Sequence, residues 1–255
     1  MNDVVYQIAC FMIMRNPATW RWSHARHHTD TIIVGCDPEI VAMRPPDLLR
    51  IGLNFFGILD AIRAMKIMLK NVFGILDPEE ASFIPEPERP KVFRIARIWF
   101  AIYAATIAVA IAMGSILPLM LIGLPGLYGA WHHVLTGILQ HAGLADNVLD
   151  HRLNRRTVLM NPVSRFVYWN MNYHIEHHMF PMVPYHALPR LHEMIEHDLP
   201  EPNSSMWQAY REVWPALRRQ LRYEDWLIKR ELPPGAKPYR PKFHGDVELA
   251  PVAAE

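Results

Sequence analysis

The sequence predicts an all-α integral membrane protein, with a transmembrane helical hairpin and a cytoplasmic helical cap that carries clustered histidines. Three observations support this prediction. Two long uncharged stretches follow one another near the middle of the chain, basic residues flank the pair, and a histidine cluster with helical spacing lies on each side of it. Hydrophobic residues make up 51% of the 255 residues, and they gather in a few segments rather than spreading evenly.

The predicted hairpin covers about residues 98–134. Residues 98–117, "IWFAIYAATIAVAIAMGSIL", are uncharged, and twenty apolar residues in a helix span the hydrocarbon core of a bilayer. Gly114, Ser115 and Pro118 predict a turn, after which a second uncharged stretch runs to Trp131. A buried helix of a soluble protein is the alternative for either stretch, but two such runs joined by a short turn are difficult to bury in so short a chain.

Charge placement predicts the orientation of the hairpin. Because cytoplasmic flanks of membrane helices are enriched in lysine and arginine, both ends of the hairpin are expected in the cytoplasm. A net charge of +1 and a sequence pI near 7.9 give no sign of a nucleic-acid-binding surface. The basic residues are Lys91, Arg94 and Arg97 before the hairpin, and Arg152, Arg155, Arg156 and Arg165 after it.

The remaining segments are assigned by their composition. Residues 4–14 are apolar but short for a span. Residues 51–76 mix apolar and charged side chains, which favours an amphipathic helix in the membrane interface, with a soluble core helix as the alternative. Residues 77–90 are expected to form a proline-rich cytoplasmic linker. We place one domain at residues 1–200, followed at 201–255 by a cytoplasmic helix and an extended tail.

Two histidine clusters carry the strongest functional signal. "WSHARHHTDT" contains His24, His27 and His28, and "NYHIEHHMFP" repeats the same HxxHH spacing. Positions i, i+3 and i+4 share one face of a helix, so each cluster can direct several ring nitrogens at a metal ion. The hairpin returns the chain to the same side of the membrane and allows the clusters to meet. A polar core or a pH-responsive patch is the alternative, although burying neutral imidazoles without partners is costly.

A further ligand is expected after the second uncharged stretch. We favour His141 over His132 and His133, which can serve as interfacial aromatic residues beside Trp131. At least six imidazoles without a thiolate argue against a structural zinc site and favour two ions, while imidazole alone suits iron, zinc, copper and nickel. Carboxylates that could orient the ligands are Asp30, Asp37, Glu39, Asp146, Asp150 and Glu176, and the histidines expected on the cytoplasmic surface are His151, His186, His192, His197 and His244.

These segments resemble a known family. "WSHARHHTDT" and "NMNYHIEHHMFPMVPYHALPRLHE" look like the second and third histidine boxes of the membrane-bound fatty acid desaturases, a group that includes related hydroxylases, and "QHAG" resembles the additional histidine segment of that family. The likeness runs from about Trp20 to Glu193. It implies that residues 1–200 form a desaturase-like domain with two non-haem iron ions at the cytoplasmic face. The iron ligands implied are His24, His27, His28, His141, His174, His177 and His178, with no further catalytic residue.

The resemblance also implies the substrate and the partners. Activated O2 would remove hydrogen from a fatty acyl chain, and two electrons would come from an external ferredoxin, rubredoxin or cytochrome b5. Iron supplies redox chemistry that side chains lack. Basic residues near the clusters could dock an acidic donor, or they could form an ordinary positive-inside loop. These residues are Arg152, Arg155, Arg156 and Arg190.

The sequence departs from the family pattern at one point. The first histidine box of the family has no counterpart, because no histidine precedes His24. We therefore expect an amino-terminally truncated desaturase. Three hypotheses follow: a desaturase that introduces a double bond into an acyl chain, a related lipid hydroxylase, and a membrane protein that retains the fold without catalysis.

Overall fold

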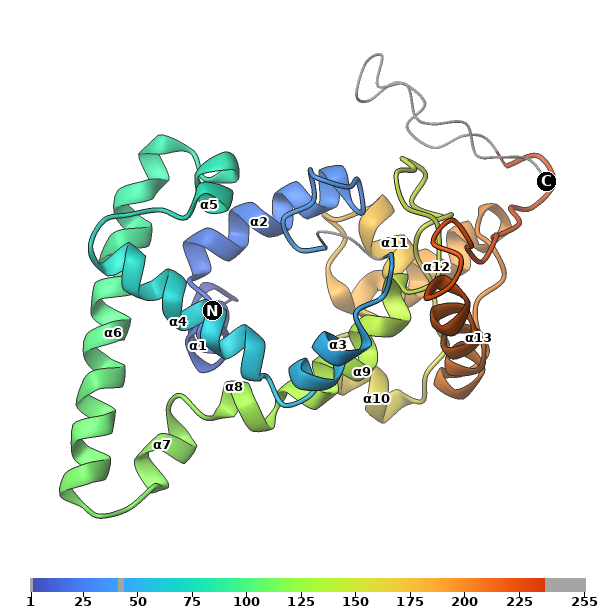
Figure 1. The fold of residues 1–255 in the computed structure, drawn as a ribbon. Coiled ribbons are helices and arrows are strands. Elements are labelled where there is room, and N and C mark those ends of the chain that lie inside the picture. Colours follow the sequence, from blue (N-terminus) through green and yellow to red (C-terminus); the bar gives the residue numbers. More distant parts are fainter. Residues whose placement is uncertain (1, 41–43, 237–255) are drawn as a thin grey trace. The chain divides into compact units, whose positions relative to one another are not determined.

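The regular structure of the protein is helical. The computed structural model describes residues 2–40 and 44–236, and this part of the chain contains helices and two isolated bridges, Thr157 to Tyr173 and Val158 to Asn203, but no strand. The all-α prediction is therefore confirmed. The chain divides into two compact units: unit 1 comprises Met1–Arg26 and Leu48–Leu135, and unit 2 comprises His27–Asp47 and Thr136–Glu255. Figure 1 shows the helices in chain order.

Unit 1 is built around the packing of α4 (Ile58–Val72) against α6 (Arg89–Ala112). Its core contains Cys10 from α1 (Asn2–Met12) together with Met68, Trp99 and Tyr103. The first part of α2 (Pro17–Asp30) belongs to this unit, and the Asn16 side-chain amide joins it to α6 by donating to the Val92 carbonyl at 3.0 Å. The shorter helices are α3 (Leu48–Asn54), α5 (Pro78–Phe83), η1 (Glu86–Glu88), α7 (Leu117–Leu121) and α8 (Pro125–Tyr128).

One helix in the described residues is long and apolar enough to cross a membrane. It covers Glu86–Ala112, and only 28% of its most apolar part is buried inside the protein. The predicted span at 98–117 therefore overlaps with this helix, which begins earlier and ends five residues sooner. It ends at Ala112 because Gly114 adopts a left-handed backbone with φ of 56°, a conformation that glycine adopts without steric cost.

The second crossing of the predicted hairpin is not a single continuous helix in the structure. Residues 118–134 contribute to three helices, α7, α8 and α9 (Ala130–His141), none of membrane length. Pro118 and Pro125 lie in the first turns of α7 and α8, where proline is tolerated and where a preceding helix cannot continue. Gly123, with φ of 102°, separates these two helices. Hydropathy therefore marked an apolar segment correctly but not its continuity.

Two further predictions in unit 1 need correction. Residues 51–76 do not form one helix, since the chain breaks at Gly57, where φ is 66° and a Cβ would lie 2.5 Å from the Gly126 carbonyl oxygen. Residues 77–90 are not a simple linker, because they form α5 and η1. Asp77 and Glu80 make a capping box at the start of α5, so the acidic residues and Pro78 initiate a helix.

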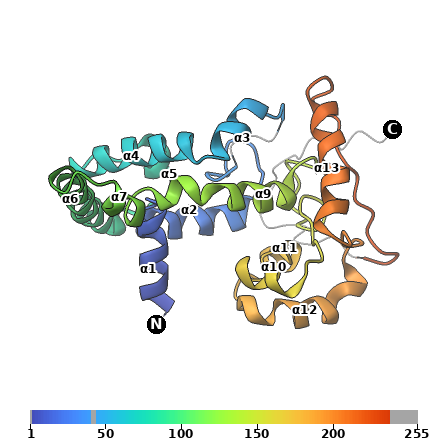
Figure 2. The same ribbon diagram turned by 90° about the horizontal axis from the view of Figure 1, so that it is seen from below.

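Unit 2 holds the C-terminal end of α2, the second half of α9, and a set of short helices (Figure 2). These are α10 (Pro162–Val167), α11 (His174–Met179), η2 (Tyr185–Ala187), α12 (Leu188–Ile195), η3 (Glu196–Asp198) and α13 (Met206–Gln220). One core cluster joins Leu139 and Val158 to α13, and another packs Ile175 and Met179 against Leu199. Most of the predicted extended tail, residues 237–255, lies outside the described residues.

Candidate metal centre

The first histidine cluster lies on the second half of α2. Its spacing places His24 one helical turn before His28, while His27 is buried. The Nδ1 atom of His27 donates to Asp37 Oδ2 at 2.8 Å. Asp37 is buried and also accepts from the backbone amides of Ile32 and Glu39, so its carboxylate is fixed in place. The proton of His27 therefore lies on Nδ1, and its Nε2 atom carries the lone pair that can bind a metal ion.

The second cluster occupies the short helix α11. His174 and His178 are buried and His177 is half-buried. The Nδ1 atom of His178 lies 3.3 Å from the Thr31 hydroxyl oxygen, and that hydroxyl donates its own proton to the His27 carbonyl. His178 Nδ1 must then be the donor, which leaves the lone pair on Nε2. This buried Nε2 atom has no hydrogen-bond partner among residues 2–40 and 44–236.

His141 ends α9 and is also buried. Its Nδ1 atom is 3.0 Å from the Asn154 carbonyl oxygen, which can only accept, so the lone pair again lies on Nε2. That Nε2 atom is 2.9 Å from His174 Nε2. This is hydrogen-bond distance, and it places the ring of His174 beside the lone pair of His141.

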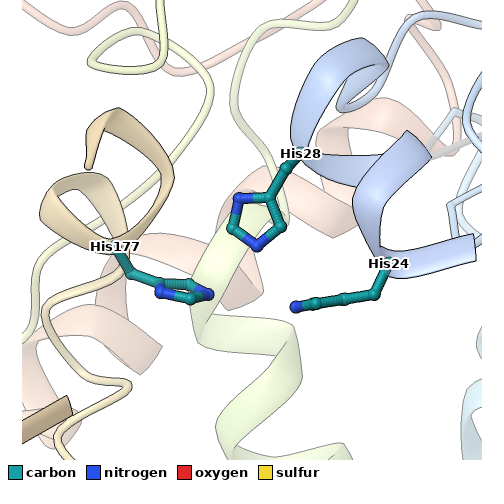
Figure 3. A group of neighbouring side chains, drawn as sticks. All are labelled: His24, His28 and His177. Carbon is teal, nitrogen blue, oxygen red and sulfur yellow. The ribbon is translucent and has the colours of Figure 1, made fainter. Parts of the chain in front are cut away.

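The histidines form two groups with converging nitrogens. In the buried group, made by His27, His141 and His178 of unit 2, the ligand atoms lie within 4.8 Å of one another. The second group has the same spacing, and Figure 3 shows its three rings pointing toward a common space. Its members are His24, His28 and His177, and the first two lie one turn apart on helix α2. The rings of His28 and His178 stack at 4.2 Å between centroids.

Burial controls the protonation of the cluster. It lowers the pKa of His141, His174 and His178 well below the ordinary value of 6.5, and the buried Arg155 guanidinium lowers all three further. These imidazoles are therefore neutral at physiological pH, which is the form that binds a metal. Neutral rings with inward lone pairs and no thiolate suit a transition metal bound through nitrogen, such as iron, zinc, copper or nickel.

The two groups and His174 account for all seven histidines that the sequence predicted as ligands. His132 and His133 belong to neither group. Of the carboxylates expected to support the ligands, Asp37 contacts one directly. Asp146 and Asp150 instead pair with Arg44 and Arg152.

Two histidines expected on the surface lie beside the clusters. His151 is buried, with its ring 5.8 Å from that of His178, and its Nδ1 accepts from Arg155 Nη1. His192 donates through Nδ1 to the fully buried Glu176, which also accepts from the Thr157 hydroxyl at 2.6 Å. Neither residue has another histidine three or four positions away in the sequence, so the spacing that marked the two clusters could not identify them.

Three arginines proposed as a docking surface are internal. Arg152, Arg155 and Arg156 are fully buried, and only Arg190 of that set is exposed. Arg152 pairs with Asp150 at 2.7 Å and with Asp198 at 2.8 Å. Burial lowers the pKa of Arg156 to about 9, and Glu212 opposes this shift. These cations therefore support the interior of unit 2 and do not present an exposed basic patch.

Comparison with known proteins agrees with this site. The family described as fatty acid desaturase matches residues 1–210 of the chain, a range that includes every histidine of the two groups. No curated protein and no solved structure gave a match.

Proposed function

The chain belongs to the fatty acid desaturase family, an oxidoreductase family, and from this premise we propose that it uses O2 and two iron ions to introduce a double bond into a fatty acyl chain. The observation that carries the proposal is the buried group formed by His27, His141 and His178. All three rings have Nδ1 committed to an oxygen acceptor, and this leaves three Nε2 atoms for one ion.

The ligand set divides between two ions. We assign His27, His141 and His178 to one ion, with His174 beside His141 as a fourth ligand. The other ion takes the second group, His24, His28 and His177. When bound, the iron ions supply the activation of O2 and the removal of hydrogen from an unactivated acyl C–H bond.

The protein's own groups orient the ligands. Asp37 fixes the ring of His27, and the Asn154 carbonyl fixes His141. Partners of this kind set the tautomer and raise the basicity of a ligating histidine. Glu176, which lies on α11 between His174 and His177, accepts hydrogen bonds from Thr157 and His192. These bonds fix the position of α11 and therefore of its histidines.

Location and partners follow from the same proposal. Helix α6 and the apolar segment at residues 118–134 form the membrane hairpin, so the chain before α6 and the chain after residue 134 lie on the same side. The basic residues that precede the apolar part of α6 favour the cytoplasmic side for the histidines. The substrate is a fatty acyl lipid, and the electrons come from an external donor of the ferredoxin, rubredoxin or cytochrome b5 type. A related hydroxylase would begin with the same hydrogen removal, and a non-catalytic member would lack the iron pair.

Iron content per purified chain tests the proposal. We expect two iron ions per chain, and loss of iron in His141→Ala and His178→Ala, while the exposed control His186→Gln retains it. Analysis of acyl products then separates an unsaturated chain from a hydroxylated one. A folded protein without iron would contradict the proposal and favour the non-catalytic alternative. A version extended upstream to the next in-frame start, tested in parallel, shows whether additional ligands raise the iron content.

A further inference from the structure

Unit 2 exposes a set of large apolar side chains beside the histidine helix. Met182 is 92% exposed, Phe166 is 83% exposed and Val163 is 73% exposed. Exposed apolar side chains that gather in one place mark a surface that contacts a membrane or another molecule. We call this set the α10 surface. It consists of Val163, Phe166, Val167 and Trp169 from α10 and the turn that follows it, and of Phe180, Met182 and Tyr185 from the segment after α11.

The two segments of the α10 surface are held together by specific contacts. The Trp169 ring packs on Tyr185 with 4.7 Å between centroids, and the Asn170 side-chain amide donates to the Tyr185 carbonyl at 3.0 Å. Trp169 and Asn170 adopt left-handed backbone conformations, with φ of 54° and 53°, which are uncommon outside glycine. The bond from Asn170 N to the Arg165 carbonyl, 2.9 Å long, closes this turn. The fold therefore maintains a costly turn at the place where Trp169 is exposed.

Charge is almost absent from this part of the chain. Between residues 157 and 185 the acidic side chains are limited to Glu176, which is fully buried, and the basic ones to Arg165. Surfaces that face water, and the rims of protein interfaces, carry charged residues of both signs. Exposed apolar side chains combined with tryptophan, tyrosine and a single arginine are typical of segments at the boundary between headgroups and acyl chains.

We infer that the α10 surface inserts into the acyl region of one membrane leaflet, as a contact of unit 2 that is separate from the crossing by α6. Lipid fits better than a protein partner, because the most exposed side chains project from a short helix and a loop that lack a charged rim. The surface also brackets α11: Trp169 lies five residues before His174, and Phe180 follows Met179 directly. Insertion would therefore hold α11 beside the leaflet. This position would bring the histidines of α11 close to acyl chains, a consequence that rests on the proposed function.

Fluorescent labels can measure the insertion directly. Phe166→Cys and Met182→Cys are made in a background where Cys10 and Cys36 are replaced by alanine and serine, and each cysteine is labelled with an environment-sensitive fluorophore. The full chain is reconstituted into vesicles of phosphatidylcholine and phosphatidylglycerol, with or without doxyl-labelled acyl chains. Arg211→Cys, at an exposed position on α13, is the matched control.

We expect doxyl lipids to quench the labels at 166 and 182 several-fold, with a blue-shifted emission, while the label at 211 is quenched by aqueous iodide instead. Equal iodide quenching at all three positions would overturn the inference. Labels at 166 and 182 that are shielded from iodide but unaffected by doxyl lipids would overturn it in favour of a second copy of the chain. Iron content of the same samples is independent of this result, so failure of the proposed function and failure of lipid insertion are distinguishable.

Discussion

Helix α6 and the interior of unit 2 place polar and apolar groups in opposite ways. Helix α6 exposes Ile98, Ile107 and Ile111 to its surroundings. Unit 2 instead buries Arg155 and His178 completely, although both are polar. An apolar exterior is stable when lipid replaces water around it, whereas buried imidazoles need a partner that uses their lone pairs. The comparison teaches that the two regions call for different surroundings under the proposed function: lipid around α6, and metal ions at the buried imidazoles of unit 2.

Removal of metal is the strongest test of this contrast. A chelator should destabilise unit 2 by about 4 kcal/mol, if the free ion had been a thousandfold above its dissociation constant, because the ion binds only the folded state. Hydrogen exchange followed by mass spectrometry should show the loss of protection in α11 and at the end of α9, with α6 unchanged. Equal loss in both regions, or none in α11, would remove the distinction between them.

A charge placed on the exposed face of α6 should weaken the association of this helix with the membrane. Ile107→Lys puts a lysine on the exposed apolar face, and insertion of a charge near the middle of a membrane helix costs about 3 kcal/mol. We expect a lower fraction of the chain to remain in the membrane after alkaline extraction. Ile107→Leu is the control and should behave as the original protein. Full retention of the lysine variant would show that α6 is covered by protein instead of lipid.

Asp37→Asn tests whether a carboxylate beside a histidine ligand strengthens metal binding. The substitution weakens the acceptor that fixes His27, and loss of such a partner typically lowers metal affinity 10- to 100-fold, or about 1.4 to 2.7 kcal/mol. Competition with a chelator of known affinity measures the change. Asp225→Asn, at an exposed position in unit 2, should leave the affinity unaltered. An unchanged affinity in Asp37→Asn would mean that the contact does not orient a ligand.

Periodic features of this chain were predictable, and features set by tertiary contacts were not. The HxxHH spacing identified both histidine helices because ring positions on a helix follow directly from sequence separation. His151 and the buried Arg152 lie outside the HxxHH clusters. Their partners Arg155 and Asp150 are close in sequence, and only the ion pair of Arg152 with Asp198 is a contact distant in sequence. Nothing local in the sequence distinguishes them from surface residues.

The second apolar stretch differs from the expected continuous helix for another reason. Its apolar composition satisfied a hydropathy criterion, but Pro118 and Pro125 each start a new helix. The two prolines therefore indicated helix breaks in the sequence, but the prediction followed the apolar composition instead. A smaller error concerns the start of α6. The span was predicted to begin at residue 98, after the charged Lys91, Arg94 and Arg97, but the helix begins at Arg89. Charge marks where a helix leaves the hydrocarbon, and it does not mark where the helix ends.

The smallest predicted effect concerns the contact between His192 and Glu176. This hydrogen bond raises the pKa of His192 above 6.5, so the folded protein holds the proton more tightly than the unfolded chain does. The stabilisation is complete below pH 6.5 and is lost as the pH rises through the folded pKa. His192→Gln should abolish this pH dependence and lower the stability of unit 2 at pH 6 by about 1 kcal/mol. Hydrogen-exchange protection of α12, corrected for intrinsic rates, measures it, with the exposed His197→Gln as control.

Glu80 in unit 1 also has a raised pKa, but burial causes the shift there, whereas a hydrogen-bond partner causes it at His192. Burial raises the pKa of Glu80 above its ordinary 4.5, against the effect of its hydrogen bonds, so the stability of unit 1 should fall as the pH rises from 4.5. Glu80→Gln should flatten this dependence in the protection of α5 and leave α12 unaltered. The signs of the two dependences agree, but the windows and causes differ: a buried acid resists ionisation in unit 1, and a paired histidine retains its proton in unit 2. Protection of α12 that followed the Glu80 window would mean that the two units do not unfold independently.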